Sequence, residues 1–204
     1  MFILGLTGSI GMGKSTTAEM FRAAGIAVHD SDASVHALYR GVAAPLVEAA
    51  FSGTVRDGVV DRAALATQVL DDPDAMKRLE AIVHPLVRAS RMDFVAAARE
   101  RGDRLVVVDI PLLFETGTEA EVDGVLLVTA PETVQKQRLA ARPGMTAARL
   151  AAIVAKQMPD PEKRRRADFL IDTGATHADT ERQVHALLRQ ILGNAENAAA
   201  PDKG

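Results

Sequence analysis

The 204-residue chain is 48% hydrophobic and carries a formal net charge of −3, which suits one domain of ordinary size or one domain with a modest insertion. Six Phe, one Tyr and no Trp leave few rings for base stacking, and the overall charge is not basic, so we expect no nucleic-acid partner. The absence of Cys excludes disulfides and thiolate metal sites.

The N-terminal apolar run is short, has no basic start and leads directly into a motif, so we interpret it as a strand and not a signal peptide. The longest apolar runs, residues 105–108 and 125–128, are far too short to cross a bilayer. We therefore expect a cytoplasmic protein without a membrane partner, present as a monomer or a weak homo-oligomer.

The first elements in chain order are a strand ending at Thr7, a helix over residues 14–24 and a strand over residues 26–29. Gly25 suits the C-terminal cap of that helix. A strand, a helix and a second strand in this order predict an α/β fold with a parallel sheet.

The middle of the chain has mostly helical periodicity. Asp72 and Pro73 form a helix start, and Pro85 is expected to open a long helix that ends near Gly102. This is more helix than a crossover between parallel strands needs, so residues 31–102 are interpreted as an inserted helical domain. The shorter elements expected within it are helices at residues 35–38, 46–51 and 62–70 and a turn or small hairpin at 53–60.

The rest of the chain returns to alternating strands and helices. Residues 105–109 and 125–129 are continuously apolar or nearly so, as expected for strands that are covered on both faces. The tail, residues 193–204, is rich in Ala, Asn and Pro and is expected to be disordered. The other expected elements are a helix opened by Pro131, a helix at residues 146–157, a strand at 169–171 and a closing helix at 176–192.

Residues 8–15, GSIGMGKS, fit the pattern G-x-x-x-x-G-K-[ST] between the first strand and the first helix. Glycines let backbone N–H groups converge on phosphate oxygens, and the helix N-terminus adds a positive dipole end. Lys14 is expected to reach the β- and γ-phosphates of ATP, and the Ser15 hydroxyl to bind Mg²⁺. The motif predicts a P-loop NTPase-type α/β fold of three layers around a central parallel five-stranded sheet.

Three classes of nucleotide-binding protein compete at this point: a small-molecule kinase, a GTPase switch and a mechanical ATPase. The sequence lacks the N/T-K-x-D guanine motif of a GTPase, and it is short for a motor. A metabolite kinase needs a group that orients the acceptor hydroxyl and a mobile basic lid, and the chain has candidates for both.

Asp32 is the candidate for the acceptor side, because it follows the second strand, whose carboxyl end lies at the ligand-binding edge of such a sheet. Asp30 is a less certain neighbour, and either carboxylate could instead cap the next helix. Asp109 ends a Val-rich strand, where a carboxylate either holds Mg²⁺ through water or simply ends the strand.

Arg138 and Arg142 are the lid candidates, because a spacing of four places them on one helix face. Arginines near the γ-phosphate stabilise the charge of the transferred group. Arg142 also precedes Pro143 and Gly144, a natural turn. The run at residues 163–166, KRRR, is interpreted instead as a solvated helix face.

With these residues in place, the chain from residue 4 to 192 resembles the dephospho-coenzyme A kinase family. The phosphate loop is similar to the family's L-T-G-G-I-G-S-G-K-S, and Arg138 with Arg142 matches its R-x-x-x-R helix. Further similar segments are DSD at 30–32, HPL at 84–86, PLLFE at 111–115, and Gln157 followed by Ala167, Asp168 and Ile171. The order and spacing of these segments together make the resemblance specific.

The resemblance implies a nucleotide core (residues 1–30, 104–135 and 168–192), a coenzyme A-binding helical insertion (31–102) and a lid (136–166). It implies transfer of the γ-phosphate of ATP to the ribose 3′-hydroxyl of dephospho-coenzyme A, with Mg²⁺. The catalytic residues carried over are Lys14, Asp32 and Arg142. The implied ATP-binding residues are Gly8, Ser9, Ile10, Gly11, Met12, Gly13, Lys14, Ser15, Thr16 and Arg138, and the implied substrate residues are Asp32, His84, Pro85, Leu112, Leu113 and Glu115.

From the residues alone, His84 and Pro85 would be a helix start, and Leu112 and Leu113 plain core. Two departures from the family pattern stand out. Ser9 and Met12 replace the usual Gly and Ser, at positions whose side chains are not expected to act. Thr173 stands where the family often has Asn, in a segment expected near the adenine. The alternatives kept open are a nucleoside monophosphate kinase or another metabolite kinase, and a non-catalytic ATP-binding regulator.

Overall fold

A computed structural model describes residues 1–199, with the side chains at 147–149 and 194–199 excepted. The chain divides into two compact units: the first comprises Met1–Val28 and the part after Ala97, and the second is His29–Ala97. The strands are β1 (Phe2–Thr7), β2 (Ala27–Asp30), β3 (Val55–Arg56), β4 (Val59–Val60), β5 (Leu105–Asp109), β6 (Gly124–Thr129) and β7 (Phe169–Asp172). The helices are α1 (Lys14–Ala23), α2 (Ser31–Leu38), α3 (Ala43–Ala50), α4 (Arg62–Val69), α5 (Pro73–Glu100), η1 (Thr118–Glu121), α6 (Glu132–Ala140), α7 (Ala147–Val154), α8 (Asp160–Arg166) and α9 (His177–Ala199).

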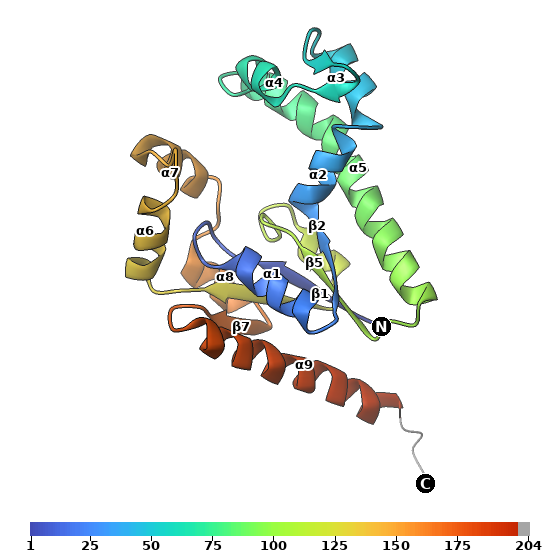
Figure 1. The fold of residues 1–204 in the computed structure, drawn as a ribbon, viewed down its shortest axis with the longest axis vertical. Coiled ribbons are helices and arrows are strands. Elements are labelled where there is room, and N and C mark those ends of the chain that lie inside the picture. Colours follow the sequence, from blue (N-terminus) through green and yellow to red (C-terminus); the bar gives the residue numbers. More distant parts are fainter. Residues whose placement is uncertain (200–204) are drawn as a thin grey trace. The chain divides into compact units, whose positions relative to one another are not determined.

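A five-stranded sheet has the order β2-β5-β1-β6-β7, and all of it except the last two residues of β2 belongs to the first unit (Figure 1). The pairings of β1 with β5, β1 with β6 and β6 with β7 are parallel. Every residue of β5 and β6 is buried, which is why both strands are continuously apolar or nearly so in the sequence. The predicted α/β class and the five-stranded sheet are confirmed.

The sheet is covered on both faces. Leu4 and Leu6 of β1 lie in a core with Phe21 of α1 and Leu188 of α9, so α1 and α9 share one face. Gly5 points to the other face, where a Cβ would lie 2.7 Å from Leu113 Cδ1. The loop after β5 therefore packs directly on the opposite face of the sheet.

The last helix is longer than expected. α9 begins at His177 and runs to Ala199, whereas a disordered tail was predicted from residue 193. The correction has a simple cause, since Ala, which is abundant in this stretch, is the strongest helix former and extends an existing helix at little cost. Residues 200–204 of the predicted tail lie outside the described residues. None of the helices up to residue 199 is both long enough and apolar enough to cross a membrane.

The second unit has its own core, which includes Val47 and Phe51 of α3, Leu65 of α4 and Leu79 of α5. In Figure 1, α3 and α4 lie beside the first turns of α5. The hairpin of β3 and β4 was anticipated, and its turn has Asp57 at φ 51° with a glycine after it. Helical elements and one small hairpin thus build this unit, as the periodicity indicated.

Pro85 does not open a helix, because α5 is continuous from Pro73 to Glu100 with Pro85 inside it. The ring removes the N–H that would bond the Ala81 carbonyl, at a cost of about 3 kcal/mol. Leu79 before the proline and Leu86 after it both belong to or pack against the core of the second unit. The burial of Leu79 and the partial burial of Leu86, at up to about 1.5–3 kcal/mol for each side chain, offset the break. The start at Asp72 and Pro73 is confirmed, since Asp72 Oδ1 accepts the backbone N–H groups of residues 74 and 75.

Candidate active site

The phosphate loop lies between β1 and α1, as the motif predicted. Gly11 and Gly13 have φ values of 80° and 88°, in the left-handed region that favours glycine. The Met12 N–H donates to the Ser9 carbonyl at 3.1 Å, which closes the loop on itself. The loop therefore has the strand–loop–helix context that a phosphate-binding function requires.

The loop glycines are also needed for packing. A Cβ at Gly8 would lie 2.8 Å from the Val128 carbonyl oxygen, and a Cβ at Gly13 would lie 2.9 Å from Thr173 Oγ1. Both contacts are closer than real Cβ atoms approach. The loop is thus held tightly against the ends of β6 and β7, which leaves little freedom for a side chain at either glycine.

Lys14, the first residue of α1, forms an ion pair and hydrogen bond with Asp109 Oδ1 at the end of β5. Asp109 is 3% exposed, so its carboxylate is paired instead of solvated. The next residues on α1, Ser15 and Thr16, are exposed at the helix N-terminus. The candidate nucleotide residues therefore gather at the carboxyl ends of parallel strands, where ligands bind in such folds.

Met12 has a larger role than the sequence suggested. Its side chain is 4% exposed, and its Sδ accepts the Ala130 N–H at 3.1 Å. The Met12 carbonyl accepts the Thr173 hydroxyl at 2.8 Å. The side chain therefore anchors the loop to the residue after β6, while the expectation that it takes no direct part in ATP binding stays a prediction.

Thr173 and Arg138 support the same part of the loop. Arg138 donates to Thr173 Oγ1 at 2.9 Å, to the Thr173 carbonyl at 2.6 Å and to the Gly11 carbonyl at 3.4 Å. The Arg138 guanidinium is therefore engaged with the loop and with the segment after β7. Arg142, one turn further, is exposed.

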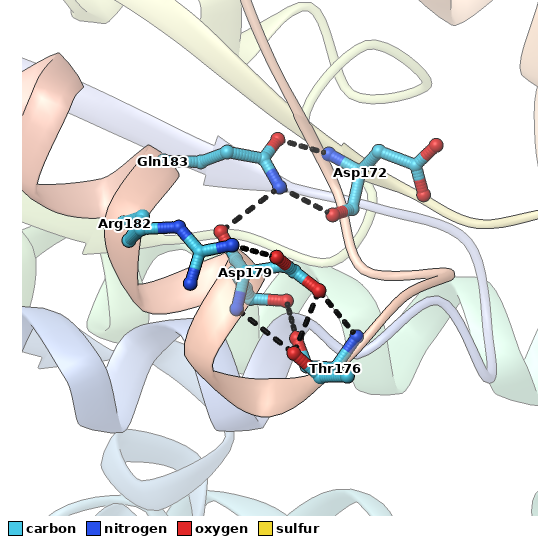
Figure 2. Close-up of polar contacts among 6 residues, drawn as sticks. Asp172, Thr176, Asp179, Arg182 and Gln183 are labelled. Atoms are coloured by element: carbon cyan, nitrogen blue, oxygen red, sulfur yellow. Dashed lines mark hydrogen bonds and ion pairs between the residues drawn. The ribbon is translucent and has the colours of Figure 1, made fainter.

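The start of α9 fixes the segment that contains Thr173 (Figure 2). Gln183 Oε1 accepts the Asp172 N–H at 2.9 Å, and Gln183 Nε2 donates to the Asp172 carbonyl at 2.7 Å. Thr176 and Asp179 cap the helix through mutual side-chain-to-backbone bonds, with Arg182 paired to Asp179. The side-chain amide of Gln183 therefore bonds both backbone polar groups of Asp172, the last residue of β7, as a neighbouring strand would.

Lys163 corrects a further expectation. It was placed with a solvated basic face, but its side chain is 0% exposed and its Nζ lies 2.8 Å from Glu115 Oε1. The Met158 N–H donates to the same oxygen at 2.7 Å. Burial raises the pKa of Glu115, but the contact with the Lys163 ammonium and the hydrogen bond from the Met158 N–H, with a further backbone bond, outweigh burial and hold the pKa below the ordinary 4.5.

Two other members of that basic run also have partners. Arg164 donates to Thr129 Oγ1 at 2.5 Å and to Asp160 Oδ2 at 2.6 Å. Arg166 pairs with Glu119 and lies over the Phe114 ring, 4.9 Å from its centroid. Arg164, Arg165 and Arg166 are all exposed, so the solvated face expected for the run is found for these three residues and not for Lys163.

In the second unit, the two aspartates near the start of α2 have different environments. Asp30 is the N-cap, and its Oδ1 accepts the Ala33 N–H at 2.9 Å. Asp32 lies in the first turn and is exposed. The cap interpretation therefore holds for Asp30 and leaves the Asp32 carboxylate at the surface of this unit.

The remaining predicted substrate residues have different environments. His84 and Pro85 are exposed on α5, and Leu112 is half-buried in the loop after β5. Leu113 is 0% exposed and packs over Gly5. The environment of Leu113 is that of a core residue, as its residue type alone had suggested.

The architecture defines the class of protein first. The fold is similar to that of shikimate kinase from Acinetobacter baumannii, with a TM-score of 0.51 and 17% identity over 95% of this chain and 94% of that one. It is closer to TT1252 from Thermus thermophilus, with a TM-score of 0.80 and 39% identity over 93% and 97% of the two chains. Together with the loop at residues 8–15, this α/β fold defines the class as a P-loop protein.

The sequence comparisons define the family. A family model described as dephospho-CoA kinase matches residues 2–179. A dephospho-CoA kinase from Mesorhizobium japonicum is 62% identical over 193 residues, which are 95% of this chain and 98% of that protein. The chain belongs to the dephospho-CoA kinase family.

Proposed function

We propose that the chain transfers the γ-phosphoryl group of ATP to the ribose 3′-hydroxyl of dephospho-CoA, giving CoA and ADP. Support comes from the family match over residues 2–179 together with an intact phosphate loop. In this reaction a bond forms between the 3′-oxygen and the γ-phosphorus, and the bond from that phosphorus to the β–γ bridging oxygen breaks. The hydroxyl proton leaves, and no covalent enzyme intermediate is needed.

Lys14 is the proposed phosphate-binding residue on the nucleotide side. Its pairing with buried Asp109 holds the ammonium next to the loop before ATP arrives, so that it has only to exchange one anionic partner for another. Arg142, which is exposed, is proposed to stabilise charge on the transferred group. Arg138 is proposed to act on bound ATP by holding the Gly11 carbonyl and Thr173.

The residues present fit Mg²⁺. The exposed Ser15 hydroxyl and the Asp109 carboxylate offer the oxygen ligands that this ion prefers, and they follow neighbouring strands of the sheet. Among residues 1–199, the described side chains hold no cluster of three or more His, Cys, Asp or Glu that could bind a metal ion, and we propose that Mg²⁺ binds mainly through phosphate oxygens and water. When bound, Mg²⁺ neutralises charge on the β- and γ-phosphate oxygens.

Asp32 is the proposed acceptor-side residue. Asp30 takes the capping role, so the Asp32 carboxylate is left exposed to align the 3′-hydroxyl and accept its proton. His84, Pro85, Leu112 and Glu115 are proposed to line the substrate side, and we further propose that the protein acts in the cytoplasm.

The test is ADP release by the purified chain with ATP and Mg²⁺, using dephospho-CoA or adenosine monophosphate as acceptor. We expect dephospho-CoA, and not adenosine monophosphate, to stimulate ADP release strongly. Lys14→Met should lose this stimulation. Stimulation by adenosine monophosphate alone would favour a nucleoside monophosphate kinase, and ATP binding without any acceptor-dependent turnover would favour a regulator.

A second variant tests the acceptor-side role. Asp32→Asn should lower kcat by about 10²- to 10⁴-fold, the usual contribution of a positioned acid–base group. Its Kd for ATP should stay within about twofold of the wild type, because the residue is not assigned to the nucleotide. A kcat close to the wild-type value would contradict the role.

A further inference from the structure

Both backbone polar groups of Ile10, in the middle of the phosphate loop, are bonded to glutamine side chains. The Ile10 N–H donates to Gln157 Oε1 at 3.2 Å. The Ile10 carbonyl accepts from Gln135 Nε2 at 2.7 Å. One glutamine thus acts as an acceptor and the other as a donor, and together they hold a single residue of the loop.

The two glutamines lie at the two ends of one segment. Gln135 is on α6, and Gln157 follows α7, so residues 136–156 connect them and include Arg142. The far end of this segment is itself anchored, because the N–H of Met158, the residue after Gln157, donates to Glu115 Oε1 at 2.7 Å. Residues 136–156 make up most of the proposed lid. At each end they adjoin a glutamine whose side chain hydrogen-bonds the phosphate loop.

The loop has a physical need for such support. Gly11 and Gly13, which follow Ile10 in the sequence, have left-handed φ values. Glycine loses more backbone conformational freedom on ordering than any other residue. A loop that is fixed before the ligand arrives avoids that loss during binding. Water could satisfy the Ile10 groups, but only fixed side chains restrict the direction in which the neighbouring amides point.

We propose that Gln135 and Gln157 are positioning residues that hold the phosphate loop in its ATP-binding conformation and tie it to the α6–α7 segment. The inference rests on the proposed function in that ATP is the ligand. It assigns the two glutamines to affinity for nucleotide and not to contact with the reacting atoms.

The test is the Kd for ATP, measured by titration calorimetry on the full chain, for Gln135→Met and Gln157→Met. Methionine is close to glutamine in size and shape, but its side chain has no N–H donor and no carbonyl acceptor. We expect each variant to bind ATP about three- to tenfold more weakly, the effect of one lost neutral hydrogen bond. Gln137→Met, at an exposed position on the same helix, is the matched control and should bind like the wild type.

A pair of charged variants tests the direction of each bond. Gln157→Glu keeps an acceptor for the Ile10 N–H, whereas Gln135→Glu removes the donor and faces the Ile10 carbonyl with a carboxylate. Both add the same charge near the same residue, so the difference between them reports hydrogen-bond polarity. We expect Gln135→Glu to bind ATP at least about threefold more weakly than Gln157→Glu.

In steady-state kinetics, KM for ATP should rise in both methionine variants while KM for dephospho-CoA stays unchanged. If both variants bind ATP within twofold of the wild type, or if they lose only thermal stability, the proposed positioning role of Gln135 and Gln157 is overturned. A wild-type chain that binds no ATP would contradict the proposed function itself, and with it the positioning role of the two glutamines.

Discussion

At the scale of single residues, the chain shows what a local motif does and does not reveal. Lys14 and the loop glycines could be assigned from sequence because all the parts of a phosphate loop are adjacent in the chain. Lys163 could not, because it is one of four consecutive basic residues and its partner, Glu115, lies far away in sequence. No periodicity in so short a helix as α8 indicates which of the four points inward.

The buried pair makes a strong prediction about stability. Lys163→Met should lower the free energy of unfolding by about 3–5 kcal/mol, because it leaves the Glu115 carboxylate without its counter-charge. Urea denaturation followed by circular dichroism measures this. The double variant with Glu115→Gln should recover part of the loss, and Arg165→Met, at an exposed position on the same helix, should change stability by less than about 0.5 kcal/mol. A loss of unfolding free energy in Arg165→Met equal to that in Lys163→Met would contradict the assignment of Lys163 to a buried ion pair with Glu115.

The same pair predicts a dependence on pH. The pKa of Glu115 is below 4.5 in the folded chain, so its contribution to stability is full above the unfolded-state pKa and declines as pH falls through the folded-state value. The stability difference between the wild type and Glu115→Gln should therefore be constant near neutral pH and shrink below about pH 4.5. A difference that grows on acidification would mean that the folded-state pKa is raised, contrary to the geometry.

At the scale of elements, most boundaries could be predicted, since caps and turns are encoded locally. Asp72, Pro73 and Gly25 marked helix ends correctly. Pro85 misled because its local effect is to break a helix, whereas the core contacts that carry α5 through it are tertiary. The extension of α9 to Ala199 was missed because the Ala-rich composition that suggested a disordered tail also favours helix.

Pro85 gives the prediction at this scale. Pro85→Ala restores the hydrogen bond to the Ala81 carbonyl and should raise the free energy of unfolding by about 1–3 kcal/mol. Ala89→Pro, one turn further along the exposed side of α5, should lower it by about 3 kcal/mol. Thermal unfolding of the three chains gives the comparison. A loss of stability in Pro85→Ala would show that the proline shapes the helix for its packing in the second unit.

At the scale of the whole molecule, the α/β class and the five-stranded sheet followed from alternating strand and helix signals, and the family from motifs in a fixed order. The supports of the phosphate loop did not follow, because Gln135, Gln157 and Thr173 meet it only after the chain has folded. The nucleotide-side residues lie in the first unit, whereas Asp32 lies in the second. We propose that residues of both units serve phosphoryl transfer from ATP to dephospho-CoA.

The measurement that tests this claim most directly is the identity of the product formed from dephospho-CoA and ATP carrying labelled γ-phosphate. Mass spectrometry with phosphorus NMR would locate the transferred group. We predict one labelled product, CoA, with the phosphate on the ribose 3′-oxygen and one ADP formed per transfer. Label released only as inorganic phosphate, or attached to another position, would contradict the account.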